Sequence, residues 1–262
     1  MLGFAVGAFG TIVGSGGGFI LTPILLLLYP HERAATLTAI SLTAVFFNAA
    51  SGSGAYARQR RIDYRSGLAF AAAALPGSIA GALVVSSVSR AVFDLVMAAV
   101  LLALAVWLLR GEPARARAPK GHLVRRVLTD RYGRTFEYDV PIRRGVAYSL
   151  VVGFVSSFLG IGGGVMHVPL LVRALGFPTH LATATSHFVL AIIAGAGALT
   201  HLTAGSFAHG HGVRRAISLS LGVVLGAQLG ARLSLRASGR LVESLLGVAL
   251  LALAARLIFS AV

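Results

Sequence analysis

The chain has 262 residues, of which 56% are hydrophobic and only 12% are charged, and its mean hydropathy is +0.85. A soluble domain carries about 25% charged residues, so this composition excludes an ordinary soluble enzyme. Several Leu/Ala/Val runs reach the roughly 20 residues that span a bilayer, and they lack the alternation of transmembrane strands. The composition therefore predicts an all-α, polytopic helical membrane protein.

The net charge of +15 is distributed between the apolar runs rather than gathered in one soluble region. Basic residues in such links act as topology signals and contact lipid headgroups, so the expected partner is the lipid bilayer and not nucleic acid. The absence of cysteine excludes disulfides and thiolate metal sites.

About eight apolar segments follow one another along the chain, and one long hydrophilic stretch divides them. That stretch, residues 110–144, holds ten basic and four acidic residues and alternates after Tyr132-Gly133, which predicts a small hairpin in a cytoplasmic loop. The apolar segments are residues 2–29, 34–56, 67–87, 92–109, 145–176, 179–202, 216–235 and 241–259.

A glycine motif interrupts the first apolar segment on each side of the loop. Gly14-Ser15-Gly16-Gly17-Gly18 precedes Pro23, and Gly160-Ile161-Gly162-Gly163-Gly164 precedes Pro169. Each glycine inside a helix costs about 1 kcal/mol relative to alanine, and proline removes a backbone donor. We expect both helices to be broken here, and we call residues 14–18 the first hinge and residues 160–164 the second hinge.

Other short patterns also occur twice, in the same order. Ala35-Thr36-Leu37-Thr38 aligns with Ala182-Thr183-Ala184-Thr185, and Gly77-x-x-x-Gly81-Ala82 aligns with Gly226-x-x-x-Gly230-Ala231. The chain is therefore predicted to be an internal duplication: residues 1–110 form one membrane repeat, 111–144 the basic loop, and 145–262 the second repeat.

The orientation of the repeats stays open at this level. If both broken segments cross the membrane, 17 of the 23 Lys and Arg lie inside and the repeats are parallel. If both turn back as re-entrant hairpins, 18 lie inside and the repeats are inverted. The positive-inside rule cannot separate these counts, but both place residues 110–144 in the cytoplasm.

The hinges are the candidate substrate site. The 11 or 12 residues that follow each hinge span roughly 16–18 Å if helical, about half of the hydrocarbon core. Unpaired backbone at that depth needs protein or water to satisfy it, and the N-terminal end of a helix attracts anions. The alternative is that the glycines only allow close helix packing.

Polar side chains near the hinges complete the candidate site. Hydroxyls, amides and imidazoles suit an oxyanion, whereas hydrogen bonds between helices are the alternative role for each of them. The two histidines could also carry a coupled proton. The predicted substrate-binding residues are Gly16, Gly17, Gly18, Gly162, Gly163, Gly164, Thr38, Ser41, Asn48, His167, Thr185, Ser186 and His187.

Acidic residues are almost absent from the spans, which argues against a cation pathway and fits an anion path. His209-Gly210-His211 in a boundary link is weak evidence for a metal, so no metal site and no cofactor are expected. No nucleophile–base pair stands out among the histidines, and the protein is not predicted to be an enzyme.

The second hinge with Pro169, the Ala-Thr-x-Thr pattern, the paired Gly-x-x-x-Gly-Ala elements, and the loop from Tyr56-Ala57-Arg58 to Ile62-Asp63-Tyr64 resemble the TauE/SafE sulfite-exporter family. The resemblance covers nearly the whole chain. It implies a multi-pass permease of the bacterial inner membrane that handles sulfite, sulfonates or related organic anions.

Two classes of function follow from these observations. The leading hypothesis is a secondary transporter of a small anion that binds near mid-membrane between the broken helices, with one repeat rocking against the other. The alternative is a membrane scaffold or assembly protein without transport activity. That alternative predicts that Gly163→Leu is tolerated apart from a general loss of stability.

Overall fold

The computed structural model describes residues 1–110, 123–207, 211–234 and 239–261. The helices before the loop are α1 (Leu2–Val13), α2 (Gly18–Leu28), α3 (Ala34–Arg58), α4 (Tyr64–Val84), the short η1 (Val85–Ser87) and α5 (Arg90–Arg110). After β1 (Val124–Thr129) and β2 (Thr135–Val140) come α6 (Ile142–Leu159), α7 (Gly164–Pro169), the π-helical η2 (Leu170–Ala174), α8 (Thr179–Thr203), α9 (Gly212–Leu233) and α10 (Gly239–Ala261).

Six helices of the described residues are long and apolar enough to cross a membrane: α3, α4 with η1, α5, α6, α8 and α9. The chain is thus a multi-pass helical membrane protein. The prediction of eight apolar segments is met only in part, because α1, α2 and the α7–η2 segment are each too short to span a bilayer, and α10 contributes the shorter apolar stretch Leu246–Arg256.

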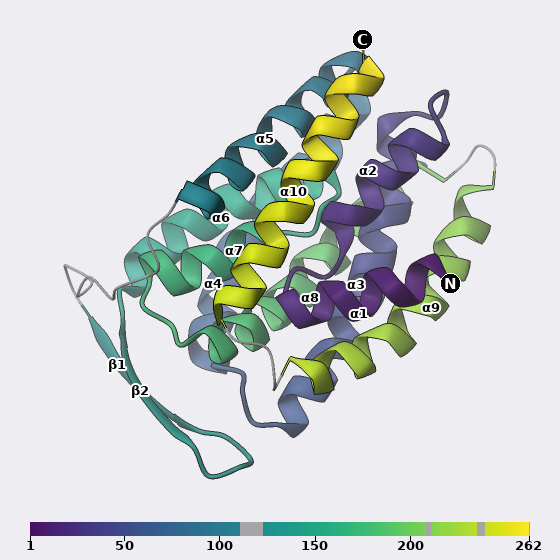
Figure 1. Ribbon diagram of the computed structural model, residues 1–262. Helices are drawn as coiled ribbons and strands as arrows, with labels where there is room; N and C mark the ends of the chain where they lie inside the picture. Colours follow the sequence, from purple (N-terminus) through teal and green to yellow (C-terminus); the bar gives the residue numbers. More distant parts are fainter. Residues whose placement is uncertain (111–122, 208–210, 235–238, 262) are drawn as a thin grey trace.

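The two most buried long helices, α3 and α8, pack against each other at the centre of the bundle. Around them, α9 packs along α1 and α3, and α4 packs along α6 and α8. The helices α5 and α10 lie side by side on one outer face, where Figure 1 shows them running diagonally across the view. Glycines allow the close contacts of α1 with α9: a Cβ at Gly3 or Gly7 would lie 2.6 Å from backbone atoms of α9.

The bundle has two distinct ends. At the one we call the hairpin end, Arg61 in the link between α3 and α4 donates from Nη2 to the carbonyl of His180 (2.9 Å), and the Arg131 N–H donates to the carbonyl of Gln59 (3.0 Å). At the opposite end, the Thr36 hydroxyl donates to the carbonyl of Ser206 (3.1 Å).

Both broken helices turn back toward the end at which they begin. The second begins directly after β2, and Phe177, which follows η2, lies with its ring 4.9 Å from that of Tyr138 in β2. The first begins at Leu2 and ends just before Tyr29, and these two residues line one cavity with His211 at the opposite end. Both broken helices thus follow the course of a hairpin, which is the course expected of the re-entrant arrangement.

The predicted hairpin is confirmed: β1 pairs with β2 in antiparallel register and projects from the helices, as Figure 1 shows. The fold is therefore not purely α-helical. The Tyr138 hydroxyl donates to Asp63 Oδ2 (3.0 Å), and Asp63 Oδ1 accepts from the Ser66 N–H (3.1 Å) at the start of α4. The hairpin is thus hydrogen-bonded to Asp63, the residue that caps α4. The helix α6 begins at Ile142, three residues before the predicted start of the second membrane repeat at residue 145.

Candidate functional site

The first hinge breaks its helix through left-handed backbone. The φ angles of Gly14, Gly16 and Gly17 are 81°, 73° and 80°, which residues with a Cβ rarely adopt. The N–H groups of Ser15 and Gly16 both donate to the carbonyl of Gly10, which closes the end of α1. Gly18 then begins α2, so the predicted break is confirmed.

The second hinge repeats this course with one difference. Gly160 and Gly162 have φ angles of 68° and 63°, whereas Gly163 has φ −19° and lies outside the left-handed region. The Gly163 N–H donates to the Ser156 hydroxyl, and Gly164 begins α7. Gly163 does not supply a left-handed backbone angle. A side chain there would instead be crowded, because a Cβ would lie 2.9 Å from Val152.

The two hinges touch each other midway along α3 and α8. A Cβ at Gly18 would lie 2.6 Å from the carbonyl oxygen of Ile161, and a Cβ at Gly164 would collide with the carbonyl oxygen of Gly14. Val45 of α3 and Leu190 of α8 each lie beside both hinges. In this arrangement the glycines allow backbone-to-backbone packing, and the N-terminal end of each half-helix faces a carbonyl of the other hinge.

Hydroxyl groups satisfy the carbonyls that the breaks leave open. Thr22 and Ser41 each place a hydroxyl oxygen 2.8 Å from the carbonyl oxygen of Gly160, and Ser186 donates to the carbonyl of Gly14 at 3.3 Å. The last carbonyls of a helix need such partners when water is absent. Ser41 and Ser186 were predicted at the hinges, and the structure places them there.

A line of buried polar side chains leads from the first hinge toward the hairpin end. The Thr11 hydroxyl donates to Asn48 Oδ1 (3.1 Å), the Tyr56 hydroxyl donates to the carbonyl of Thr11 (2.7 Å), and the rings of Tyr56 and His187 meet edge to face at 5.6 Å. We call Thr11, Asn48, Tyr56 and His187 the polar column. All four are fully buried.

The polar column has unused hydrogen-bonding capacity. Within the described part of the chain, Asn48 Nδ2 lacks a hydrogen-bond partner, and the His187 ring has no closer partner than the Gly14 backbone of the first hinge. A buried polar group without a partner costs about 1–3 kcal/mol. Groups held at such a cost inside a membrane span are candidates for binding a substrate.

The packing of the fold does not require this polarity. A Cβ at Gly52 of α3 would meet His187 of α8 and Thr11 of α1, at 2.6 and 3.2 Å. A Cβ at Gly197 of α8 would meet Leu42 of α3 and Ser157 of α6, at 3.0 and 2.8 Å. A leucine packs against the helix glycine in the second case, so close packing against such a glycine does not by itself call for a histidine.

Three predicted residues lie outside the polar column, one of them at the second hinge. Thr38 packs beside Gly160, and its hydroxyl has no partner among the described residues. Thr185 accepts from the Asp63 N–H (3.0 Å) near the hairpin end. His167 lies 3.3 Å from the Ser149 hydroxyl and 5.9 Å, ring to ring, from Phe70. The structure therefore does not join Thr185 and His167 to the polar column.

Sequence reasoning missed Thr11, Thr22 and Tyr56. Thr11 and Thr22 are single hydroxyls in an apolar segment, where hydrogen bonding between helices is the ordinary role. Their distance from the first hinge, three residues before Gly14 and four after Gly18, was the available signal.

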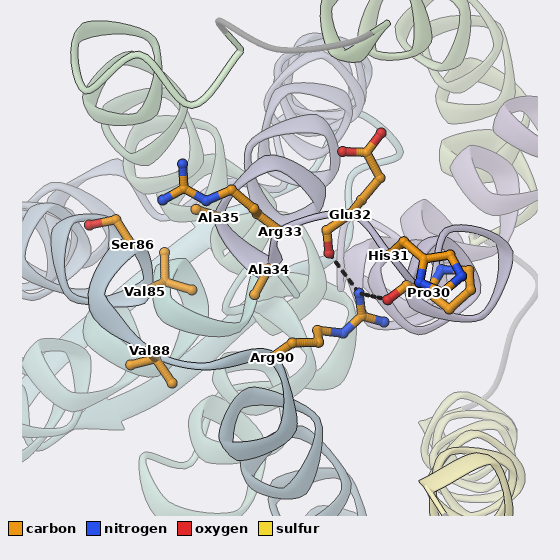
Figure 2. A pocket seen from close by; sticks show the side chains of 10 residues that line it. All are labelled: Pro30, His31, Glu32, Arg33, Ala34, Ala35, Val85, Ser86, Val88 and Arg90. Atoms are coloured by element: carbon orange, nitrogen blue, oxygen red, sulfur yellow. Dashed lines mark hydrogen bonds between the residues drawn. The ribbon is translucent and has the colours of Figure 1, made fainter.

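The opposite end has a cavity of about 190 Å³ between the start of α3 and the turn before α5, which Figure 2 shows. Arg90 lines it, donates to the carbonyls of Leu26, Tyr29, Pro30 and Glu32, and pairs with Asp94 at 2.8 Å. These bonds cap the C-terminal end of α2, so Arg90 holds the fold together there.

No cluster of three potential metal ligands occurs in the described ranges, and His209 and Gly210 lie outside them.

Long apolar helices around two re-entrant broken helices define a polytopic membrane transporter by class. The chain matches the family described as "Sulfite exporter TauE/SafE" over residues 1–257, and it belongs to that family. It is 30% identical over 213 residues to "Probable membrane transporter protein YunE" of Bacillus subtilis, covering 78% of this chain and 77% of that protein.

Two further relatives carry similar descriptions. "Probable membrane transporter protein MJ0441" of Methanocaldococcus jannaschii is 26% identical over 209 residues, 78% of this chain and 71% of that protein. A "Probable membrane transporter protein" of Xylella fastidiosa is 29% identical over 183 residues, 68% of this chain and 62% of that protein. No solved structure matches the chain.

Proposed function

We propose that the protein is a secondary transporter of a small anion, which binds where the two hinges meet. The observation that carries the proposal is the meeting of two broken helices midway along α3 and α8, beside a fully buried polar column. Half-helix N-termini carry partial positive charge, which favours an anion. Amide and imidazole groups add hydrogen bonds without a permanent charge.

Substrate binding requires the hinges to part. In the observed arrangement the carbonyls of Ile161 and Gly14 face the N-terminal ends of α2 and α7. Movement of one half against the other would replace these carbonyls with the substrate anion, as in the rocking motion of inverted-repeat transporters. The two halves would be copies of one ancestral unit, a view that their opposed re-entrant hairpins support.

Sulfur oxyanions such as sulfite and sulfonates are the first candidate substrates. The family description supports this class, and the polar column offers donors suited to an oxyanion. His187 could carry a coupled proton. The hairpin end would face the cytoplasm of a bacterial inner membrane, because the basic residues of the link between α3 and α4 and of the hairpin lie there, among them Arg58, Arg125 and Arg126.

Uptake into liposomes tests the proposal. Purified protein should take up sulfite or methanesulfonate, measured with and without a pH gradient. The variant His187→Leu should keep its folded state, because a leucine already packs against a helix glycine at Gly197, and should lose most of the uptake. No uptake across a broad anion panel by the unchanged protein would count decisively against the proposal.

The scaffold alternative makes a different prediction for the second hinge. A transporter should lose uptake in Gly163→Leu, since a side chain there meets Val152 and Ile193 and holds the hinge in one position. A scaffold should show no uptake with or without the substitution, and Gly163→Leu should only lower its stability. Thermal unfolding of the purified variant, measured beside uptake, separates the two.

A further inference from the structure

Arg61 is buried in a way that is unusual for an arginine at the edge of a membrane bundle. It lies in the link between α3 and α4, yet its side chain is 1% exposed and turns inward between three helices. Its Nη1 donates to Gln59 Oε1 (2.9 Å) and to the Ser234 hydroxyl (3.3 Å), and its Nη2 donates to the carbonyl of His180 (2.9 Å). All of these acceptors are neutral.

Arg61 has no ion pair with a carboxylate among the residues that the structure describes, and its Nε lacks a partner there as well. Asp130 is near enough to attract it, but it is already paired with Arg134 at 2.7 Å and accepts the N–H of Tyr132. Burial lowers the pKa of Arg61, with Tyr56 opposing the shift. An arginine nevertheless stays charged, so a buried positive charge remains without a counter-ion.

The contrast with Arg90 shows what a structural arginine looks like in this fold. Arg90 also joins separate segments, but it is paired with Asp94 and its remaining donors meet helix-end carbonyls. An arginine can therefore join separate segments of this fold while it is paired with a carboxylate. Arg61 is distinguished by an unfilled donor and an unbalanced charge.

Arg61 lies at the hairpin end of the polar column. Its guanidinium is 5.2 Å from the centre of the Tyr56 ring, and the same ring meets that of His187. The Tyr56 hydroxyl donates to the carbonyl of Thr11, whose own hydroxyl donates to Asn48. One continuous series of buried donors thus runs from Arg61 to the first hinge. A charged group at its end and neutral groups farther in would draw an anion inward without holding it too tightly.

We propose that Arg61 is an anion-binding residue at the hairpin end of the transport path, where it receives a small oxyanion and passes it to the polar column. This inference rests on the proposed function and adds a residue and a binding position to it. The planar guanidinium fits an anion with two oxygens on one face, such as sulfite or a sulfonate, better than it fits the spherical chloride.

The test compares Arg61→Gln with Arg58→Gln, which removes an exposed arginine from the same end of α3. In liposomes, Arg61→Gln should raise the KM for sulfite and methanesulfonate about 10- to 150-fold, the loss expected for a charged hydrogen bond. Arg58→Gln should match the unchanged protein. Chloride at equal concentration should compete poorly with sulfite in the unchanged protein.

Each outcome decides the matter. If Arg61→Gln transports like Arg58→Gln, the assignment of Arg61 is wrong while the proposed function stands. If the unchanged protein neither transports nor is thermally stabilised by any of these anions, the proposed function and this inference both fail. If Arg61→Gln does not fold, Arg61→Lys decides: it keeps the charge, and a KM equal to that of the unchanged protein would overturn the two-oxygen contact.

Discussion

Gly52 and Gly54 of α3 lie two positions apart but in opposite surroundings. A Cβ at Gly52 would lie 2.6 Å from the His187 ring, whereas a Cβ at Gly54 would meet nothing within 4 Å. We expect Gly52→Ala to destabilise the protein by about 1–3 kcal/mol through overpacking and to reduce uptake. Gly54→Ala should leave stability unchanged or raise it by up to about 1 kcal/mol.

Thermal unfolding of both variants in the same detergent checks this prediction. Equal stability of the two would show that the polar column has room to move aside, which would contradict the tight fit of His187 against α3.

The helical phase explains which polar residues could be placed from the sequence. Ser41, Val45, Asn48 and Gly52 recur every three or four residues and so share the face of α3 that meets the hinges. Thr185 follows Thr183 by two positions and therefore points elsewhere, toward Asp63. A list of hydroxyls near a hinge contains both kinds, and only the position of the neighbouring helices separates them.

Arg61 escaped prediction for a different reason. It stands among Arg58, Arg60 and Arg65, and a run of basic residues between two spans is normally a solvated topology signal. Nothing in the run indicates which side chain turns inward. That choice is made by Gln59, Ser234 and His180, which come from three separate segments.

At the scale of elements, Asp63 joins the hairpin to the membrane helices. Its carboxylate accepts from Tyr138 of β2 at 3.0 Å, lies 3.5 Å from Arg126 of β1, and caps α4. Burial raises the pKa of Tyr138, and the Asp63 carboxylate raises it further, so the phenol stays protonated and donates throughout the accessible pH range.

Tyr138→Phe should loosen the hairpin without unfolding the bundle. The lost hydrogen bond to a carboxylate is worth about 1.5–3 kcal/mol, and the remaining contacts of the ring with Phe177 are kept. Limited proteolysis should cut the variant faster between β1 and β2, while Tyr132→Phe, at an exposed position of the same turn, serves as the control. Equal cutting rates would show that the hairpin is held by other contacts.

The sequence predicted the positions of the two helix breaks. It did not predict which residues beside one break make the same contacts as residues beside the other. The glycine runs break both helices where the sequence puts the breaks, whereas Pro23 and Pro169 lie inside the helices that follow. The Ala-Thr-x-Thr patterns, however, aligned Thr38 with Thr185. In the structure Thr38 packs beside Gly160 and Thr183 packs beside Gly14, so the contacts differ from that alignment by two residues.

At the scale of the whole molecule, the charge counts could not decide between crossing and re-entrant hinges because each arrangement moves nearly as many arginines inward as outward. The structure decides through contacts between distant segments. Phe177 reaches Tyr138, and His180 reaches Arg61, which fixes the start of α8 at the hairpin end. Hydropathy and charge are counted within one segment at a time, so they carry no information on which distant segments contact each other.

Cysteine labelling tests this arrangement directly, because the natural chain has no cysteine to give a background signal. Single cysteines at Tyr132 in the hairpin turn and at Arg33 at the opposite end mark the two sides. A cysteine at Thr179 should react with an impermeant maleimide from the same side as Tyr132, since the second hinge returns α8 to the hairpin end. A full crossing of α6 and α7 would instead put Thr179 on the same side as Arg33.

The same experiment, performed on intact cells and on inverted vesicles, assigns the hairpin end to a compartment. The basic residues gathered there predict the cytoplasm, so Tyr132 and Thr179 should react only in inverted vesicles.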